Sequence, residues 1–150
     1  MFLLHCSLTG SVSIMNNAFL SSLPPLPASM LTSSAQVVVQ ANPALASLQF
    51  LAGIRAVDQV NVVNNSALAD LRGLESLQSV WGLEIGQNAR LTGTAALRSL
   101  QQLSWLKVYE NPMLTAVTLP NTQLVTVSRR LVFANLTLRV VRSRRDGTSC

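Results

Sequence analysis

The chain has 150 residues, of which 49% are hydrophobic, 5% are aromatic and 11% are charged, with a formal net charge of +5. This composition is too apolar for an intrinsically disordered protein, and the length is enough for one domain with an aliphatic core. Two cysteines at opposite ends, Cys6 and Cys150, and one histidine, His5, offer neither a disulfide within an elongated chain nor a metal site, so no cofactor is expected.

Residues 1–30 are expected to form an irregular N-terminal coil and cap. Val12, Ile14 and Asn17 match a pattern that recurs later, but prolines then interrupt the chain at Pro24, Pro25 and Pro27. The apolar residues 1–8 lack a positively charged start, which disfavours a cleaved signal peptide. No stretch reaches the roughly 20 apolar residues that cross a bilayer, so no transmembrane segment is expected.

Four regular repeats of 23 residues are predicted between residues 31 and 123. Each contains an asparagine at the same place, and these are Asn42, Asn65, Asn88 and Asn111. After the asparagine, an apolar residue recurs at every third position, as at Leu68, Leu71, Leu74 and Leu77. Among the positions expected to face inward, only Ser34 and Thr94 are not aliphatic. This frame matches the leucine-rich pattern.

A period of three fits neither a regular helix nor a strand, but it fits extended or 3₁₀ segments, which bring every third side chain to one side. We therefore predict an α/β fold of the leucine-rich-repeat type. It is a right-handed solenoid, similar to a β-helix, with a parallel sheet of short strands and mostly irregular or 3₁₀ return segments. The strands are expected at residues 37–39 and at the equivalent places of the later repeats.

The repeated asparagines are predicted to form a buried structural ladder. An asparagine amide both donates and accepts, so one side chain can satisfy backbone groups at the turn that follows each strand. Leaving such a group buried and unpaired costs about 1–3 kcal/mol. The ladder is expected to contain Asn17, Asn42, Asn65, Asn88, Asn111 and Asn135.

The pattern weakens toward the C-terminus. Residues 124–138 are interpreted as a degenerate last coil, and residues 139–150 as a basic, disordered tail. The tail carries an excess of arginine, but no aromatic residue follows Phe133 to stack on bases, which disfavours nucleic acid as a partner.

Three segments resemble the repeats of receptor L domains, the ligand-binding modules of insulin-receptor and epidermal-growth-factor-receptor type proteins. They are Asn-Pro-Ala-Leu-Ala-Ser-Leu at 42–48, Asn-Ser-Ala-Leu-Ala-Asp-Leu at 65–71 and Asn-Pro-Met-Leu at 111–114, and the strand entry at 79–85 is also similar. The resemblance covers roughly residues 10–138. It implies a non-catalytic binding module of a larger receptor-like protein, extracellular or at the cell surface.

The positions of the strands that point outward are the candidate binding surface. Stacked strands would place Glu84 beside Lys107, with exposed aromatic side chains near this pair. Such a surface suits a protein or carbohydrate ligand. The candidate binding residues are Trp81, Glu84, Trp105, Lys107, Tyr109 and Glu110.

Two other functions remain as alternatives. Polysaccharide-active β-helix enzymes need clustered carboxylates, but Asp58, Glu84 and Glu110 fall in different columns of the predicted sheet, so catalysis is not expected. An intracellular scaffold would place the chain in the cytoplasm, and a truncated fragment without activity of its own is a further alternative. A glycan at Asn64, within Asn64-Asn65-Ser66, would favour the exterior; the second sequon starts at Asn135.

Overall fold

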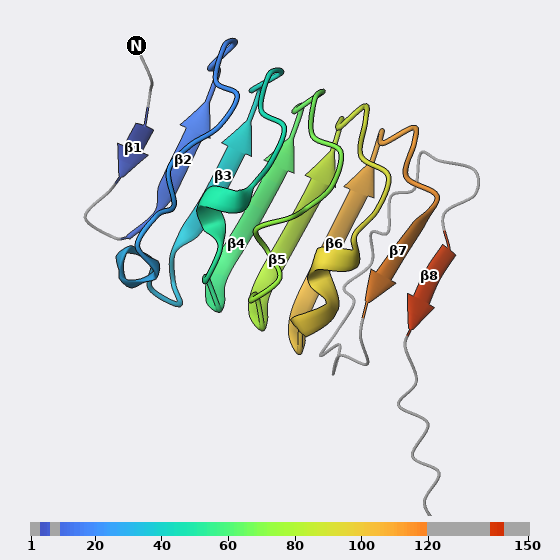
Figure 1. Cartoon of the computed structure of the whole chain (residues 1–150). Coiled ribbons are helices and arrows are strands. Elements are labelled where there is room, and N and C mark those ends of the chain that lie inside the picture. Colours follow the sequence, from blue (N-terminus) through green and yellow to red (C-terminus); the bar gives the residue numbers. More distant parts are fainter. Residues whose placement is uncertain (1–3, 7–9, 120–138, 143–150) are drawn as a thin grey trace, which may run out of the picture.

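A parallel sheet dominates the computed structural model, which describes residues 4–6, 10–119 and 139–142 (Figure 1). Its parallel strands are β2 (Val12–Met15), β3 (Gln36–Gln40), β4 (Ala56–Val63), β5 (Ser79–Gly86) and β6 (Gln102–Tyr109). Strand β1 (Leu4–Cys6) pairs with β2 in the antiparallel sense. The helical residues of the described part lie in 3₁₀ turns, η1 (Ala28–Met30), η2 (Gln49–Leu51) and η3 (Ala95–Ser99). The predicted parallel sheet with few helices is confirmed.

The strands are paired in the register that the repeat spacing predicts. Val37 pairs with Val60, Val60 with Leu83, and Leu83 with Leu106. Each connection between parallel strands runs across the same face of the sheet, where η2 and η3 also lie (Figure 1). The opposite face, which we call the open face, is not covered by these connections.

An aliphatic core fills the space between the sheet and its connections. All the predicted inward positions from Val37 to Val117 are buried, including Thr94, whose hydroxyl oxygen accepts a hydrogen bond from the Thr118 N–H at 3.0 Å. The prediction for Ser34 is wrong, because Ser34 is exposed and Ala35 is buried in its place. The aromatic ring of Phe50 is also buried, although it lies outside the period of three.

The asparagine ladder is present at every predicted position that the structure describes. The side-chain nitrogen of Asn65 donates to the carbonyls of Val39 (2.9 Å) and Val63 (3.1 Å). Its oxygen accepts the backbone N–H of Asn42 at 3.2 Å. Equivalent bonds link the other units, so each amide joins one strand to the strand before it. Asn135 lies outside the described residues.

The residue before each ladder asparagine has a left-handed backbone, which the sequence did not predict. Its φ angle lies between 49° and 58° in all five cases, and its N–H donates to a carbonyl of the next unit where such a bond is described. This conformation turns the chain sharply at the end of the strand. The residues are Asn16, Ala41, Asn64, Gln87 and Glu110.

A second, smaller sheet corrects the description of the tail. Strand β7 (Ala116–Leu119) pairs in parallel with β8 (Arg139–Arg142), in a register that sets Val117 opposite Val140. Residues 139–142 therefore form a strand, although the sequence had placed them in a disordered tail. The β-branched Val140 and Val141 favour an extended backbone, and β7 supplies the pairing partner. The predicted degenerate coil at 124–138 and the rest of the tail, 143–150, lie outside the described residues.

Candidate functional site

The structure brings the predicted binding residues together at one end of the open face. Trp81 and Glu84 lie on β5, and Trp105, Lys107 and Tyr109 lie on the neighbouring strand β6. Gly82 is the register partner of Trp105, Glu84 of Lys107, and Gly86 of Tyr109. These residues form the candidate site, which we call the aromatic cluster: Trp81, Glu84, Trp105, Lys107 and Tyr109.

Two glycines of β5 position the aromatic rings of β6. A Cβ atom at Gly82 would collide with the indole of Trp105, and one at Gly86 would collide with the phenol ring of Tyr109. Each ring therefore lies across the backbone of the adjacent strand, and both glycines are buried beneath the rings. These pairs were not predicted from the sequence, although the repeat length of 23 residues relates Gly82 to Trp105 and Gly86 to Tyr109.

Trp81 and Trp105 form an edge-to-face pair. Their ring centroids are 6.1 Å apart and their planes are inclined at 88°. This is one of the arrangements that the aromatic quadrupole favours. Trp105 is half-buried, whereas 53% of Trp81 is exposed. Trp81 therefore presents an indole to solvent while its neighbour restricts its orientation.

An ion pair lies next to the aromatic rings. The Lys107 Nζ atom is 2.8 Å from Glu84 Oε1 and 4.5 Å from the centroid of the Tyr109 ring. The Glu84 side chain is 20% exposed and that of Lys107 is 42% exposed, so the pair is partly screened by solvent. Lys107 contacts both a carboxylate and an aromatic face, which fixes the position of its charge.

Tyr109 is neutral over the physiological pH range. Burial raises its pKa to about 12, and the negative charge of Glu84, a hydrogen bond to Glu84 and the charge of Glu110 act in the same direction. The phenol hydroxyl thus remains a hydrogen-bond donor at neutral pH.

Glu110 lies at the edge of the cluster rather than within it. It occupies the left-handed position after β6, is exposed, and accepts a hydrogen bond from the Gln87 Nε2 atom at 2.8 Å. Two further polar features of the face were not predicted. Ser79 Oγ donates to Gln102 Oε1 at 3.0 Å, and the buried Oδ1 atom of Asn61, beside Glu84 in the register, has no hydrogen-bond partner.

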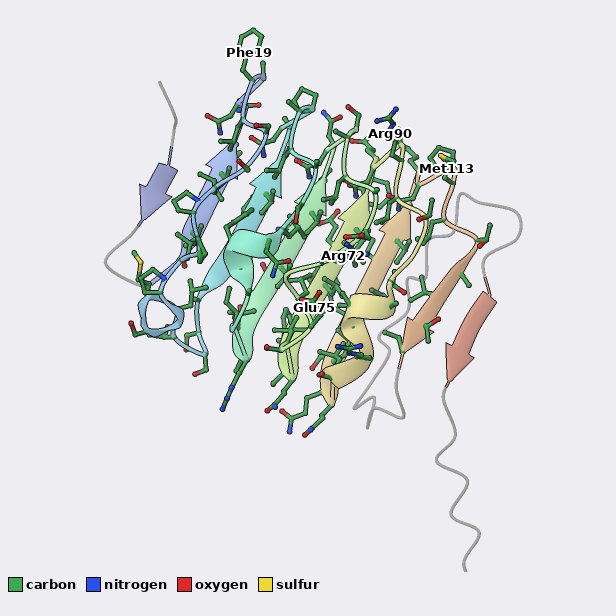
Figure 2. All side chains as sticks on the ribbon, viewed as in Figure 1. Phe19, Arg72, Glu75, Arg90 and Met113 are labelled. Atoms are coloured by element: carbon green, nitrogen blue, oxygen red, sulfur yellow. The ribbon has the colours of Figure 1, made fainter. Side chains whose placement is uncertain are left out.

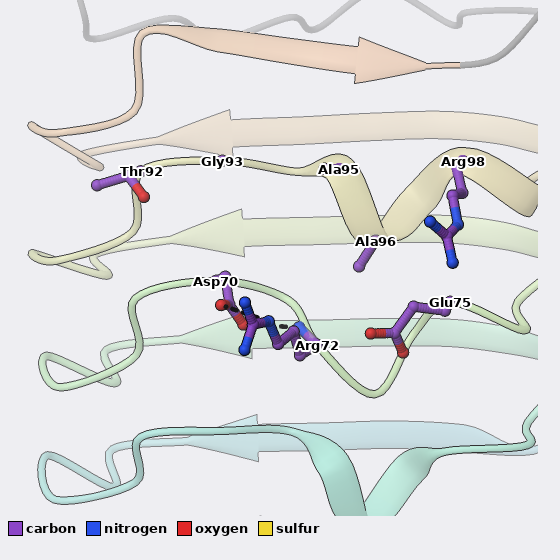
Figure 3. A pocket seen from close by; sticks show the side chains of 8 residues that line it. All are labelled: Asp70, Arg72, Glu75, Thr92, Gly93, Ala95, Ala96 and Arg98. Carbon is purple, nitrogen blue, oxygen red and sulfur yellow. Dashed lines mark hydrogen bonds and ion pairs between the residues drawn. The ribbon is translucent and has the colours of Figure 1, made fainter.

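A shallow depression of about 270 Å³ lies on the face of the sheet that the connections cover, which we call the connecting face (Figure 3). Arg72 pairs with Asp70 at 3.2 Å, but the two side chains are 75% and 39% exposed. Glu75 accepts the backbone N–H of Gly73 at 2.7 Å. Exposed pairs of this kind contribute little, about 0–1 kcal/mol. The acidic groups of the depression are thus bound locally or solvated, and they make a weaker candidate site than the aromatic cluster.

The three acids of the open face are separated in the sheet. Asp58 lies on β4, Glu84 on β5 and Glu110 after β6, and Glu84 has Asn61 and Lys107 as its register partners.

The described part of the chain contains no group of three or more His, Cys, Asp or Glu side chains placed to hold a metal ion. It also contains no helix of the length and hydrophobicity that a membrane crossing requires.

Asn64 is exposed, as predicted, and lies at the turn after β4. The hydroxyl of Ser66, the third residue of its sequon, is 3.4 Å from the Pro43 carbonyl.

Comparisons of the chain with protein-family models, with curated proteins and with solved structures found no match.

Proposed function

We propose that this chain is a non-catalytic binding module, which holds a protein or carbohydrate ligand on its open face. In this proposal the units form a right-handed, leucine-rich-repeat-like solenoid of the receptor L-domain type. The parallel strands in register and the amide ladder support this reading. The right-handed sense follows the general rule for crossovers between parallel strands.

The aromatic cluster is the observation that carries the proposal. A folded protein gains little by leaving a large indole exposed, yet Trp81 is held on a regular strand beside an ion pair and a second indole. Binding surfaces commonly combine rigid aromatic side chains with nearby charge. Because strands β5 and β6 hold these groups already, little conformational entropy would be lost on binding.

An extracellular or cell-surface location belongs to the same proposal, with the chain as one part of a larger receptor-like protein. The exposed position of Asn64 is compatible with a glycan and supports this placement. The cytoplasmic scaffold is the alternative, and fractionation of native host cells distinguishes the two.

Binding by matched variants on the two faces tests the proposal. The purified chain, Trp81→Ala and the connecting-face variant Arg72→Ala would each be applied to a glycan array and to immobilised extracellular proteins of the host. We expect Trp81→Ala to weaken retention about tenfold or more and Arg72→Ala to leave it unchanged. Equal retention of all three proteins, or a loss confined to Arg72→Ala, would contradict the proposed surface.

A further inference from the structure

We infer that the open face over β5 and β6 takes a neutral, β-1,4-linked oligosaccharide, with one sugar ring stacked on Trp81. This inference rests on the proposed function, since it assumes that the open face is the ligand surface, and it adds the chemical class of the ligand.

The first argument is the exposed indole. The carbon–hydrogen face of a pyranose ring is weakly positive, and the face of an aromatic ring is negative, so the two surfaces attract and exclude water. Trp81 is 53% exposed and is held by its edge-to-face contact with Trp105. A sugar ring can therefore stack on Trp81 without reorganising the strand.

The second argument is the flatness of the surface beside Trp81, where the rings of Trp105 and Tyr109 lie. Gly82 and Gly86 have no side chains, and the rings of Trp105 and Tyr109 lie across them instead. The surface therefore has no protruding aliphatic group at these positions. A β-1,4-linked glycan is an extended, flat ribbon. Because the plane of Trp81 is inclined at 88° to that of Trp105, such a ribbon would place a ring face against Trp81 and its edge along this surface.

Polar groups on both sides of Trp81 can bind sugar hydroxyls. Ser79 and Gln102 form one hydrogen-bonded pair, and Glu84 and Lys107 form another, with Trp81 between them in the sequence of β5. From Ser79 to Glu84 the strand spans about 16 Å at the usual rise per residue, so a chain of a few sugar rings can reach both pairs. Carboxylates and amides accept from hydroxyls, and ammonium groups donate to them.

Charge on the open face argues against an acidic ligand. Among the described residues, the charged side chains at the outward positions of β4, β5 and β6 and at the turn after β6 are three acids and one base, a net charge of −2: Asp58, Glu84, Glu110 and Lys107. A polyanion, such as an acidic polysaccharide or a nucleic acid, would be repelled by this surface. A neutral or N-acetylated glycan meets no such penalty.

The distribution of exposed apolar side chains favours a sugar over a protein. Within the described residues the large exposed hydrophobic side chains are Phe19, Met30, Trp81 and Met113, and Trp81 alone lies on the open face. Phe19 and Met113 project from the edge formed by the turns that follow the ladder asparagines (Figure 2). Protein interfaces usually centre on several buried anchors, whereas a sugar needs one aromatic surface with hydrogen-bonding groups around it.

Tryptophan fluorescence provides a local test, because Trp81 and Trp105 are the only tryptophans of the chain. The intact chain would be titrated with cellohexaose and with chitohexaose, and with maltohexaose as a curved glycan of different linkage. We expect saturable quenching by at least one of the β-1,4-linked hexasaccharides and a weaker effect of maltohexaose. Calorimetry should show affinity falling about tenfold or more in Trp81→Ala and unchanged in Phe19→Ala, the matched control at the edge. Circular dichroism would establish that both variants are folded.

No response to either β-1,4-linked hexasaccharide at concentrations up to about 10 mM would overturn the inference. Equal losses in Trp81→Ala and Phe19→Ala would also overturn it, because the binding would then lie elsewhere. The two proposals fail separately. If immobilised proteins but no hexasaccharide retain the chain, and Trp81→Ala abolishes that retention, the binding module stands and the sugar class is wrong. If neither kind of ligand is retained through Trp81, both proposals fail.

Discussion

The indole of Trp105 lies across Gly82, its register partner on the adjacent strand, so closely that no side chain fits between the ring and the backbone. The buried glycine and the half-buried tryptophan form one structural feature built from two successive units. A change at either residue therefore alters the shape of the open face as well as the stability of the sheet.

Replacement of Gly82 by valine should displace Trp105 from the sheet surface. We expect the free energy of unfolding to fall by about 1–3 kcal/mol, as is usual when volume is forced into a packed site. Urea denaturation would measure the loss, and the tryptophan emission of the folded state should shift. Gly93→Ala is the matched control, since a Cβ there would meet no atom within 4 Å, and its stability should change little.

Asn65→Ala should be strongly destabilising. The variant loses donors to the Val39 and Val63 carbonyls and the acceptor of the Asn42 N–H, all within the protein interior. Because several buried groups would lack partners, we expect a loss of about 3 kcal/mol or more, measured by thermal and urea denaturation. Gln59→Ala, at an outward position of β4, the strand that precedes Asn65, should cost less than about 1 kcal/mol. A small effect at Asn65 would show that the amide ladder is dispensable.

Ala41→Gly should stabilise the protein, although glycine usually weakens regular structure. Ala41 has a φ of 55°, a conformation that costs L-residues roughly 1–2 kcal/mol and glycine very little. Glycine also has a greater chain entropy in the unfolded state, which offsets part of this gain. We therefore expect the free energy of unfolding, measured by urea denaturation, to rise by about 0.5–1 kcal/mol. Ala46→Gly, at an exposed residue without a left-handed backbone, should show no gain.

The titration of Tyr109 should link stability to alkaline pH. The folded protein raises its pKa from 10.0 to about 12, so the folded state holds the proton more tightly than the unfolded state. The resulting stability is fully present below pH 10 and is lost as the pH rises toward 12. Tyr109 is the only tyrosine, so ultraviolet difference spectra follow this one group. Glu84→Gln should lower its midpoint, because it removes a nearby negative charge. An unchanged midpoint would contradict the contact with Glu84.

Asn64 should carry a glycan when the chain passes through a secretory pathway. Its side chain is exposed at a turn, where a glycosyl transferase can reach it. Intact-mass spectrometry before and after treatment with a peptide N-glycosidase would reveal the modification. Ser66→Ala removes the sequon and leaves Asn64 in place, so the glycan should disappear from that variant. Full occupancy in the Ser66→Ala protein would assign the glycan to another residue.

Most of the core could be predicted from the sequence, because the inward positions of successive units are chemically alike. The ladder asparagines could be predicted for the same reason, since the same backbone need recurs in each unit. Ser34 was misplaced because the pattern begins irregularly there, and the small Ala35 occupies the buried position. The left-handed residues gave no signal, since Ala41, Gln87 and Glu110 have no chemistry in common.

The fine structure of the candidate site depends on contacts between units. The register of Glu84 with Lys107 followed from the repeat length alone. The burial of Gly82 under Trp105 did not, because it depends on how the aromatic side chain leaves its own strand. Strand β8 was missed because its pairing with β7 is a property of the folded chain, and the excess of arginine in this segment suggested a solvated tail.

Four ladder amides point the same way, and the side-chain oxygen of each accepts from the unit before it: Asn42, Asn65, Asn88 and Asn111. Evolution can therefore lengthen or shorten the proposed solenoid by one whole unit, since the same hydrogen bonds link each pair of neighbouring units. An insertion of any other length within a strand would break the hydrogen bonds between one ladder amide and the unit before it. We therefore infer that growth of such a protein proceeds by duplication of complete modules, and that smaller insertions are confined to the connecting segments.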